Sequence, residues 1–302
     1  MKRFLTLVRR ELWEHHALWV APVAVSILML LGTAFGRGMS IAHDSMGVAL
    51  PQDLSRAIFA IAVVGFGLAQ YVTMSVVLWF YATRCLYDER GDRSILFWRS
   101  LPVSDNETVL SKAAVAIVVA PAIVFVVAAL SSLVAFGIFS VRGFGAEAPI
   151  QALWNTRTWL GIEGDTVLAL LFATLWYAPV TAYLMLVSAW ARRNVQVWVI
   201  LPPLVAVILE RLVVGTHYLS TILLYRLGRG WESDLVISIE RLFTGPALGP
   251  AGFPTRPSFT SGGSVSHALA QAYGNIDLWI GLAVAAALFY AAARIRRYRD
   301  ET

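Results

Sequence analysis

Residues 113–141 read AAVAIVVAPAIVFVVAALSSLVAFGIFSV, without one charged side chain. An α-helix needs about 20 predominantly apolar residues to cross the hydrocarbon layer of a bilayer. This stretch is longer than that, and runs of the same kind recur along the chain. The stretch therefore predicts a membrane-spanning helix, and its recurrence predicts a protein that crosses the bilayer several times.

Six runs are long, apolar and nearly free of charge, and we expect each to form a transmembrane helix. They cover residues 17–35, 57–83, 113–141, 166–191, 195–214 and 276–293. None of them alternates between apolar and polar residues, which excludes a membrane β-barrel. The expected fold is therefore all-α: a polytopic membrane protein with six transmembrane helices, forming a single domain over residues 1–302.

The overall composition agrees with a bilayer protein. Apolar residues make up 58% of the chain and charged residues 14%, whereas soluble domains average about 25% charged residues. A net charge of +5 at first sight suits nucleic acid. The arginines, however, lie beside the apolar runs, where they set topology and contact anionic lipid heads. The expected partner is the lipid bilayer, and no nucleic acid is expected.

Lysine and arginine residues cluster on one side of the expected topology. The clusters are Lys2, Arg3, Arg9 and Arg10; Arg84, Arg90, Arg93, Arg99 and Lys112; Arg192 and Arg193; and Arg294, Arg296, Arg297 and Arg299. The excess of positive charge marks the cytoplasmic side of a membrane protein. Both ends of the chain are therefore expected in the cytoplasm.

The segment 1–16, before the first run, has the pattern of an amphipathic helix. Phe4, Val8 and Leu12 recur at helical spacing, and Arg9 and Arg10 take the other face. Such a helix is expected to lie flat in the headgroup layer. A simple basic anchor is an alternative, and the two descriptions are physically compatible.

Residues 215–275 form the longest connection and are expected outside the cytoplasm. Two apolar stretches, 218–227 and 235–243, are too short to cross the bilayer and predict re-entrant, interfacial or extracellular helices. Glu210 and Arg211 lie near the outer end of the fifth run. An intramembrane charge is a functional hint by default. This position close to the outer interface favours a structural ion pair over a functional role.

The cytoplasmic connection 84–112 has the most unusual composition. A mixed-charge patch runs directly into an apolar group at positions 95–98, and Ser104 and Glu107 then form an S-x-x-E capping box for the next helix. Aromatic residues ringed by charges are typical of the centre of a protein interface. The alternative is that the group packs against the chain's own helices or the headgroups; composition alone leaves both open.

This connection resembles the ABC-2-type permease family, the membrane subunits of bacterial ABC exporters. The resemblance covers residues 87–112, with Tyr-Asp-Glu-Arg, Asp-Arg-Ser-Ile-Leu-Phe-Trp-Arg-Ser-Leu-Pro-Val-Ser-Asp and Ser-Lys in order. The six-run order, the N-terminal helix and the insertion after the fifth run also fit that family. The resemblance implies a coupling element that docks into an ATPase, formed by Asp88, Glu89, Arg90, Asp92, Arg93, Ile95, Leu96, Phe97, Trp98, Arg99 and Leu101.

The chain lacks the G-x-x-x-x-G-K-[ST] loop that binds nucleotide phosphates, and its lysines are Lys2 and Lys112 alone. We therefore expect no enzyme activity and no cofactor in this chain. The resemblance implies a homodimer with two copies of a separate ATPase subunit, which would bind ATP and Mg²⁺, in the bacterial cytoplasmic (inner) membrane. His15 and His16 are adjacent and do not face one way on a helix, so no metal site is expected.

Other functions stay open at the level of sequence. A secondary transporter would need carboxylates for ion coupling at membrane depth, and the first four runs contain none. A membrane enzyme would need clustered acids, bases or metal ligands. A sensor or scaffold could use the same architecture without transport. The transported substrate cannot be read from the sequence.

Overall fold

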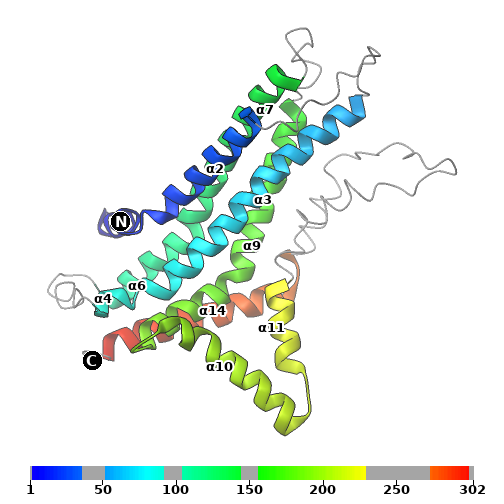
Figure 1. Cartoon of the computed structure of the whole chain (residues 1–302). Coiled ribbons are helices and arrows are strands. Elements are labelled where there is room, and N and C mark those ends of the chain that lie inside the picture. The colour runs from blue at the N-terminus through cyan, green and yellow to red at the C-terminus, as the bar shows by residue number, and fades with distance from the viewer. Residues whose placement is uncertain (1, 36–51, 92–103, 144–155, 229–272, 299–302) are drawn as a thin grey trace.

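The computed structural model describes residues 2–35, 52–91, 104–143, 156–228 and 273–298, and all regular structure in these ranges is helical. Figure 1 shows long helices running side by side, with shorter ones at one end and along one edge. The second apolar stretch of the insertion, 235–243, and the apolar group 95–98 lie outside the described residues.

Six helical stretches are long and apolar enough to span a membrane, which confirms the predicted number of spans. They are Ala17–Phe35, Gly65–Gly91, Asp105–Ile138, Thr166–Trp190, Val195–Val214 and Ile276–Tyr298. Large apolar side chains on their outer surfaces are exposed, among them Leu28 and Leu130 at 70% and 58%. So much exposed apolar surface is typical of a protein that contacts lipid.

The helices that contain the first four spans are α2 (Ala17–Phe35), α3 (Gln52–Arg84), the run α6–η2–α7 and α9 (Thr156–Trp190). The run comprises α6 (Asp105–Ala114), the π-helical turn η2 (Val115–Val119) and α7 (Ala120–Gly143). The predicted capping box is present, because Ser104 Oγ accepts from the Glu107 amide and the Glu107 carboxylate accepts from the Ser104 amide. These two bonds satisfy amides that a helix start otherwise leaves unpaired.

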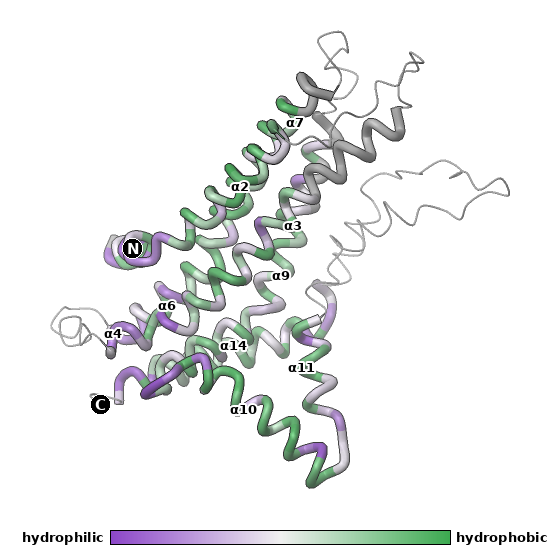
Figure 2. Tube along the Cα trace, viewed as in Figure 1, coloured by the Kyte–Doolittle hydropathy of each residue, from purple (hydrophilic) through white to green (hydrophobic). Residues whose placement is uncertain are grey.

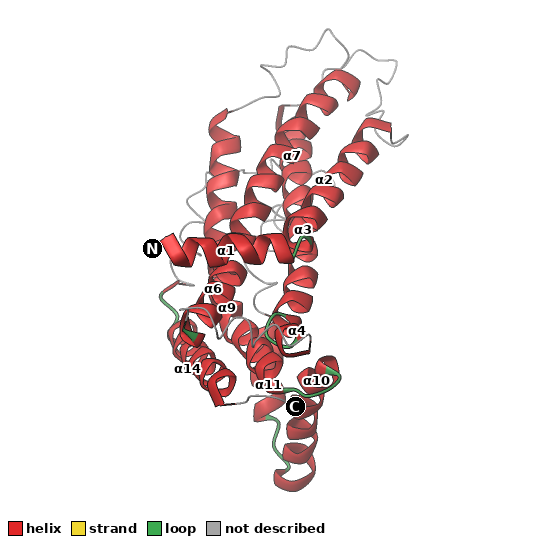
Figure 3. Cartoon of the chain, turned by 90° about the vertical axis from the view of Figure 1, so that its left-hand side faces the viewer, coloured by secondary structure: helices red, strands yellow, loops and turns green. Residues whose placement is uncertain are grey.

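Two short helices flank the bundle at one end. In Figure 3, α1 (Lys2–Glu14) lies across the direction of the long helices. The single-turn α4 (Asp88–Gly91) follows α3 directly. Figure 2 shows the hydrophilic parts of α1, α4 and α6 gathered near the C-terminal end of α14 (Ile276–Tyr298). The apolar core at this end contains Tyr81, Cys85, Leu86, Val109 and Met185, each at most 5% exposed.

The segment α10–η3–α11 departs from the other helices, as Figure 1 shows. Helix α10 (Val195–Leu209) starts after Asn194, whose φ of 49° is left-handed, a conformation that asparagine adopts more readily than most residues. The π-helical turn η3 (Glu210–Val214) ends at Gly215, and α11 (Tyr218–Gly228) then returns toward α14.

Arg226 attaches the end of α11 to the bundle. Its guanidinium lies 4.1 Å from the ring centre of the buried Trp176 and donates to the Asp277 carbonyl at 3.1 Å. The close approach depends on Gly281, because a Cβ there would lie 1.8 Å from Arg226 Nη2. One cation over an aromatic face therefore joins α9, α11 and α14.

Candidate functional site

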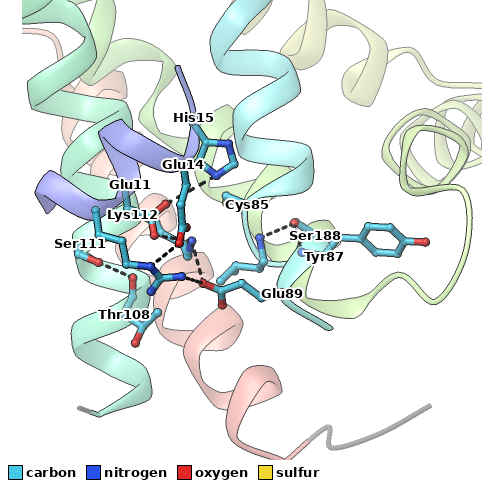
Figure 4. Close-up of polar contacts among 12 residues, drawn as sticks. Glu11, Glu14, His15, Cys85, Tyr87, Glu89, Thr108, Ser111, Lys112 and Ser188 are labelled. Carbon is cyan, nitrogen blue, oxygen red and sulfur yellow. Dashed lines mark hydrogen bonds and ion pairs between the residues drawn. The ribbon is translucent and has the colours of Figure 1, made fainter. Parts of the chain in front are cut away.

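Four charged residues from four helices meet inside the end of the bundle that carries α1 and α4. They are Glu11, Glu89, Lys112 and Arg296, from α1, α4, α6 and α14, and each is at most 6% exposed. We call these four residues the charge junction. Figure 4 shows three of them converging between their helices.

Lys112 binds two carboxylates in the charge junction. Its Nζ lies 2.7 Å from Glu11 Oε1 and 3.1 Å from Glu89 Oε1. Tyr81 adds a hydrogen bond, donating to Glu11 Oε2 at 3.2 Å. Lys112 reaches this position because Thr108, Val109 and Ser111 turn the same side of α6 inward.

Glu89 forms ion pairs with three cations, Lys112, Arg296 and Arg10. Beside Lys112, its Oε2 accepts from Arg296 Nη1, and its Oε1 lies 3.6 Å from Arg10 Nη2. Arg296 donates through Nε to Asp105 Oδ1 at 3.1 Å as well. Ion pairs thus join the short helix α4 to α1, α6 and α14.

Charge is balanced inside the charge junction, with two cations and two anions. Removing charged groups from water is costly, and mutual pairing and further hydrogen bonds are needed to offset it. A buried network of this kind gives little net stability over well-packed apolar residues, but breaking it by removing one partner is costly. The network connects residues of four helices at this end of the bundle.

A second set of polar contacts joins the turn after α3 to the end of α9. Ser188 Oγ accepts from the amides of Leu86 and Tyr87, at 3.1 and 3.0 Å. Arg90 donates to the carbonyls of Ser188 and Ala191, at 2.6 and 2.9 Å. A cation at the last carbonyls of a helix is favourable because these groups have no partner within the helix. The start of the 84–112 connection is therefore fixed to a fifth helix.

The residues predicted to couple to an ATPase fall into three groups. Asp88 is exposed, whereas Glu89 and Arg90 point inward and bind the chain's own groups. The remaining ones lie outside the described residues: Asp92, Arg93, Ile95, Leu96, Phe97, Trp98, Arg99 and Leu101. In the described part, the connection's first turn serves as an anchor to the bundle.

The residues of α1 predicted to face the membrane interface are placed as follows. Val8 and Leu12 pack against the core, and Phe4 is half-buried. Arg10 pairs with Glu14 at 2.6 Å, whereas Arg9 is exposed. The apolar face of α1 thus contacts the bundle.

Glu210 and Arg211 do not pair with each other within the described part of the chain. Glu210 instead caps α11, accepting from Thr216 Oγ1 at 2.9 Å and from the Leu219 amide at 2.8 Å. Arg211 is exposed. These contacts give Glu210 a local structural role at the junction of η3 and α11.

His15 lies beside Glu11 and Glu14, with candidate ligand atoms within 4.8 Å of one another. This grouping was not predicted from the sequence. Both carboxylates already have cationic partners, Lys112 and Arg10, at 2.7 and 2.6 Å. Burial lowers the pKa of His15, with Lys112 adding to the effect and Glu11 opposing it. A metal ion would have to displace existing ion pairs, so the donor set fits a metal poorly.

A buried carboxyl that the sequence analysis missed is Glu163, in α9. It is 8% exposed and accepts a hydrogen bond from Ser132 Oγ of α7 at 3.1 Å. Burial raises the pKa of Glu163, and the bond from Ser132 partly offsets the rise. The carboxyl was missed because the expected span began at residue 166, whereas α9 begins at Thr156.

The sequence analysis also did not predict that the four residues of the charge junction lie together. Lys112 and Arg296 were read as topology signals, and Glu11 was not singled out. One feature of the sequence pointed to a buried charge. Leu7 and Glu11 are four residues apart and therefore lie on the same side of α1, which is the buried side. A carboxylate on the side of a helix that faces the core requires a buried cation.

Comparison of the chain with protein-family models, with curated proteins and with solved structures gives no match. The function is therefore argued from the residues and their geometry.

Proposed function

We propose that this chain is the membrane-spanning permease subunit of an ATP-driven ABC exporter. It would form the translocation path as a homodimer and be driven by two copies of a separate ATPase subunit. The proposal rests on the resemblance of residues 87–112 to ABC-2-type permeases and on the six apolar helices.

The observation that carries the proposal is the anchoring of the 84–112 connection. Its start is held to α1, α6 and α14 through Glu89 and to α9 through Arg90. A water-facing loop with an apolar aromatic group is costly to leave uncovered. A partner that covers the group and moves it would pull on all four helices together. Such rigid-body movement is how transporters change access.

The proposed orientation follows the distribution of arginine and lysine. Both chain ends and the 84–112 connection would lie in the cytoplasm, and the membrane would be the bacterial cytoplasmic (inner) membrane. In this arrangement α1 lies in the headgroup layer. The exposed Leu5 and Trp13, at 65% and 64%, would enter the lipid from the side of α1 that faces away from the bundle.

ATP hydrolysis belongs to the partner in this proposal. The partner would bind ATP and Mg²⁺, and this chain would bind no cofactor. Its role is to convert movement at residues 84–112 into a change of helix packing.

Co-purification of the tagged full chain with an ATPase encoded beside it tests the proposal. The double variant Phe97→Asp and Trp98→Asp should lose the ATPase subunit, because charge in the aromatic group opposes a buried contact. Tyr298→Asp is the matched control, since Tyr298 is an exposed aromatic residue at the end of α14, 71% exposed. If the double variant retains the ATPase and its rate of hydrolysis, the docking assignment is wrong.

Glu163 supports a second candidate, a proton-coupled secondary transporter. A buried carboxyl with a raised pKa keeps its proton to higher pH than an ordinary carboxyl does, as a proton-coupling group requires. In proteoliposomes, substrate transport driven by an imposed pH gradient without ATP, and lost in Glu163→Gln, would favour this candidate. Transport that requires ATP and survives Glu163→Gln would favour the exporter.

A further inference from the structure

The turn between α9 and α10 carries two arginines whose charge no other described residue neutralises. Arg192 and Arg193 are exposed, and neither guanidinium group forms an ion pair or a hydrogen bond within the described part of the chain. The last carbonyls of α9 could have bound them, but those of Ser188 and Ala191 already accept from Arg90. Capping of α9 therefore does not explain the two arginines.

The position of this turn brings it close to lipid headgroups. Residues 191–194 connect two helices that are each long and apolar enough to span a membrane, Thr166–Trp190 and Val195–Val214. In a bilayer, a connection this short keeps the turn in the headgroup layer. Figure 2 shows it as a hydrophilic stretch before the apolar α10. Lipid phosphates are the anions that such a turn meets first.

The turn has a fixed shape because α3 and α9 hold the start of α10. Asn194 has a left-handed φ of 49°, which turns the chain sharply into α10. Gln196 donates to Thr83 Oγ1 of α3 at 3.0 Å, and Tyr183 of α9 donates to the Val199 carbonyl at 3.0 Å. A site on a rigid base loses less conformational freedom when a ligand binds.

An exposed aromatic pair lies on either side of the two arginines in the chain. Trp190 ends α9 and Trp198 lies in the first turn of α10; they are 39% and 38% exposed, and their ring centres are 4.8 Å apart, edge to face. Val197 and Ile200 continue this apolar surface along α10, at 52% and 54% exposed. Tryptophan favours the boundary between headgroups and acyl chains. Charge for a phosphate and apolar surface for an acyl chain thus lie close together.

We propose that the α9–α10 turn binds the headgroup of one anionic phospholipid. Arg192 and Arg193 bind its phosphate through paired N–H groups, and Trp190 and Trp198 contact the upper part of its acyl chains. The phosphate supplies the negative charge that the first turn of α10 lacks, since that turn contains no acidic residue. The site does not depend on the ATPase partner; only its assignment to the cytoplasmic leaflet rests on the proposed orientation.

Native mass spectrometry of the full chain in detergent, titrated with phosphatidylglycerol or with phosphatidylcholine of the same acyl chains, tests the proposal. The wild type should bind the first phosphatidylglycerol about thirtyfold more tightly, because each arginine near an anionic lipid contributes a factor of about five. The double variant Arg192→Gln with Arg193→Gln should lose this preference. The control Arg294→Gln with Arg297→Gln removes the same charge from exposed arginines of α14 and should keep it.

A double variant that keeps the preference, or a control that loses it equally, would overturn the proposal. Both arginines are exposed and unpaired in the described structure, so their replacement should leave the melting temperature unchanged. If the double variant fails to fold, Arg192→Gln and Arg193→Gln carry the test singly, each with about a fivefold loss of preference.

Two further measurements separate a lipid site from a simple anion site. Trp198→Leu should weaken the binding of both lipids and keep the preference, because it removes apolar contact and no charge; unchanged binding would refute the contact assigned to the aromatic pair. Excess inorganic phosphate should not displace phosphatidylglycerol, and displacement would overturn the lipid assignment. No ATPase is present in these titrations, so their outcome judges the lipid site separately from the proposed function.

Discussion

Lys112 Nζ lies 2.7 Å from Glu11 Oε1, although the two residues are 101 positions apart in the chain. Lys112 lies in α6 and Glu11 lies in α1, and both residues are almost inaccessible to water. This pair makes the N-terminal helix a part of the bundle. It also gives the most direct test of the charge junction.

Lys112→Met should lower the free energy of unfolding by about 3–5 kcal/mol, because it removes the close cation of the buried Glu11 carboxylate and one of the cations of Glu89. Unfolding in a detergent titration measures the change.

The double variant Lys112→Met with Glu11→Gln should lose less unfolding free energy than the sum of the two single losses. Glu14→Gln is the control, since its partner Arg10 is partly exposed and such pairs contribute about 1 kcal/mol or less. A Lys112→Met protein as stable as the wild type would contradict the assigned burial.

Ser188→Ala should destabilise the turn between α3 and α4. The hydroxyl accepts from two amides, Leu86 and Tyr87, and its loss leaves both unpaired in a buried place. We expect a loss of about 2 kcal/mol in unfolding free energy. Ser220→Ala, which removes an exposed hydroxyl in α11, should change stability by less than about 0.5 kcal/mol. Equal effects of the two variants would refute the tertiary role of Ser188.

Glu163 should make stability depend on pH. Its pKa in the folded protein is raised, so the folded state holds the proton more tightly than the unfolded state does. The stability from this proton is complete below the ordinary carboxyl pKa and is lost as pH rises through the raised value. Thermal unfolding across pH should show this fall, and Glu163→Gln should remove it.

Ser132→Ala should extend the fall to higher pH, because the hydroxyl stabilises the charged carboxylate. Identical pH profiles for wild type and Glu163→Gln would contradict the prediction.

Gly281→Ala should displace the Arg226 guanidinium and loosen α11. The new Cβ would lie 1.8 Å from Arg226 Nη2 and 2.6 Å from Cζ, so the guanidinium must leave the face of Trp176. The guanidinium is the far end of a flexible side chain, and Trp176 and Tyr177 still donate to the carbonyls of Arg226 and Leu227, so the expected cost is about 1 kcal/mol or less, with faster exchange of α11 amides. Gly67→Ala in α3 is the control, because nothing lies within 4 Å of its added Cβ and alanine favours the helix. Unaltered exchange in α11 would show that Arg226 does not hold the helix.

Apolar length was enough to predict the spans but not the ends of the helices. The expected second, third and fourth runs began at residues 57, 113 and 166, whereas the helices begin at Gln52, Asp105 and Thr156. A lack of charge marks the part of a helix that lies in hydrocarbon. Polar residues continue the same helix into the interface, where water and headgroups can solvate them. Asp105 and Glu163 both lie in such polar continuations, although Glu163 is buried against Ser132 of α7.

The sequence by itself determined that six helices of this chain are long and apolar enough to cross a membrane, because long uncharged runs are poorly solvated by water and satisfy their backbone in helices. It also determined the start of α6, since a capping box acts over three residues. Only the tertiary structure decided that Glu11, Glu89, Lys112 and Arg296 share one buried site. Coulombic attraction is not directed along the chain, so the choice of partner depends on which helix ends pack together.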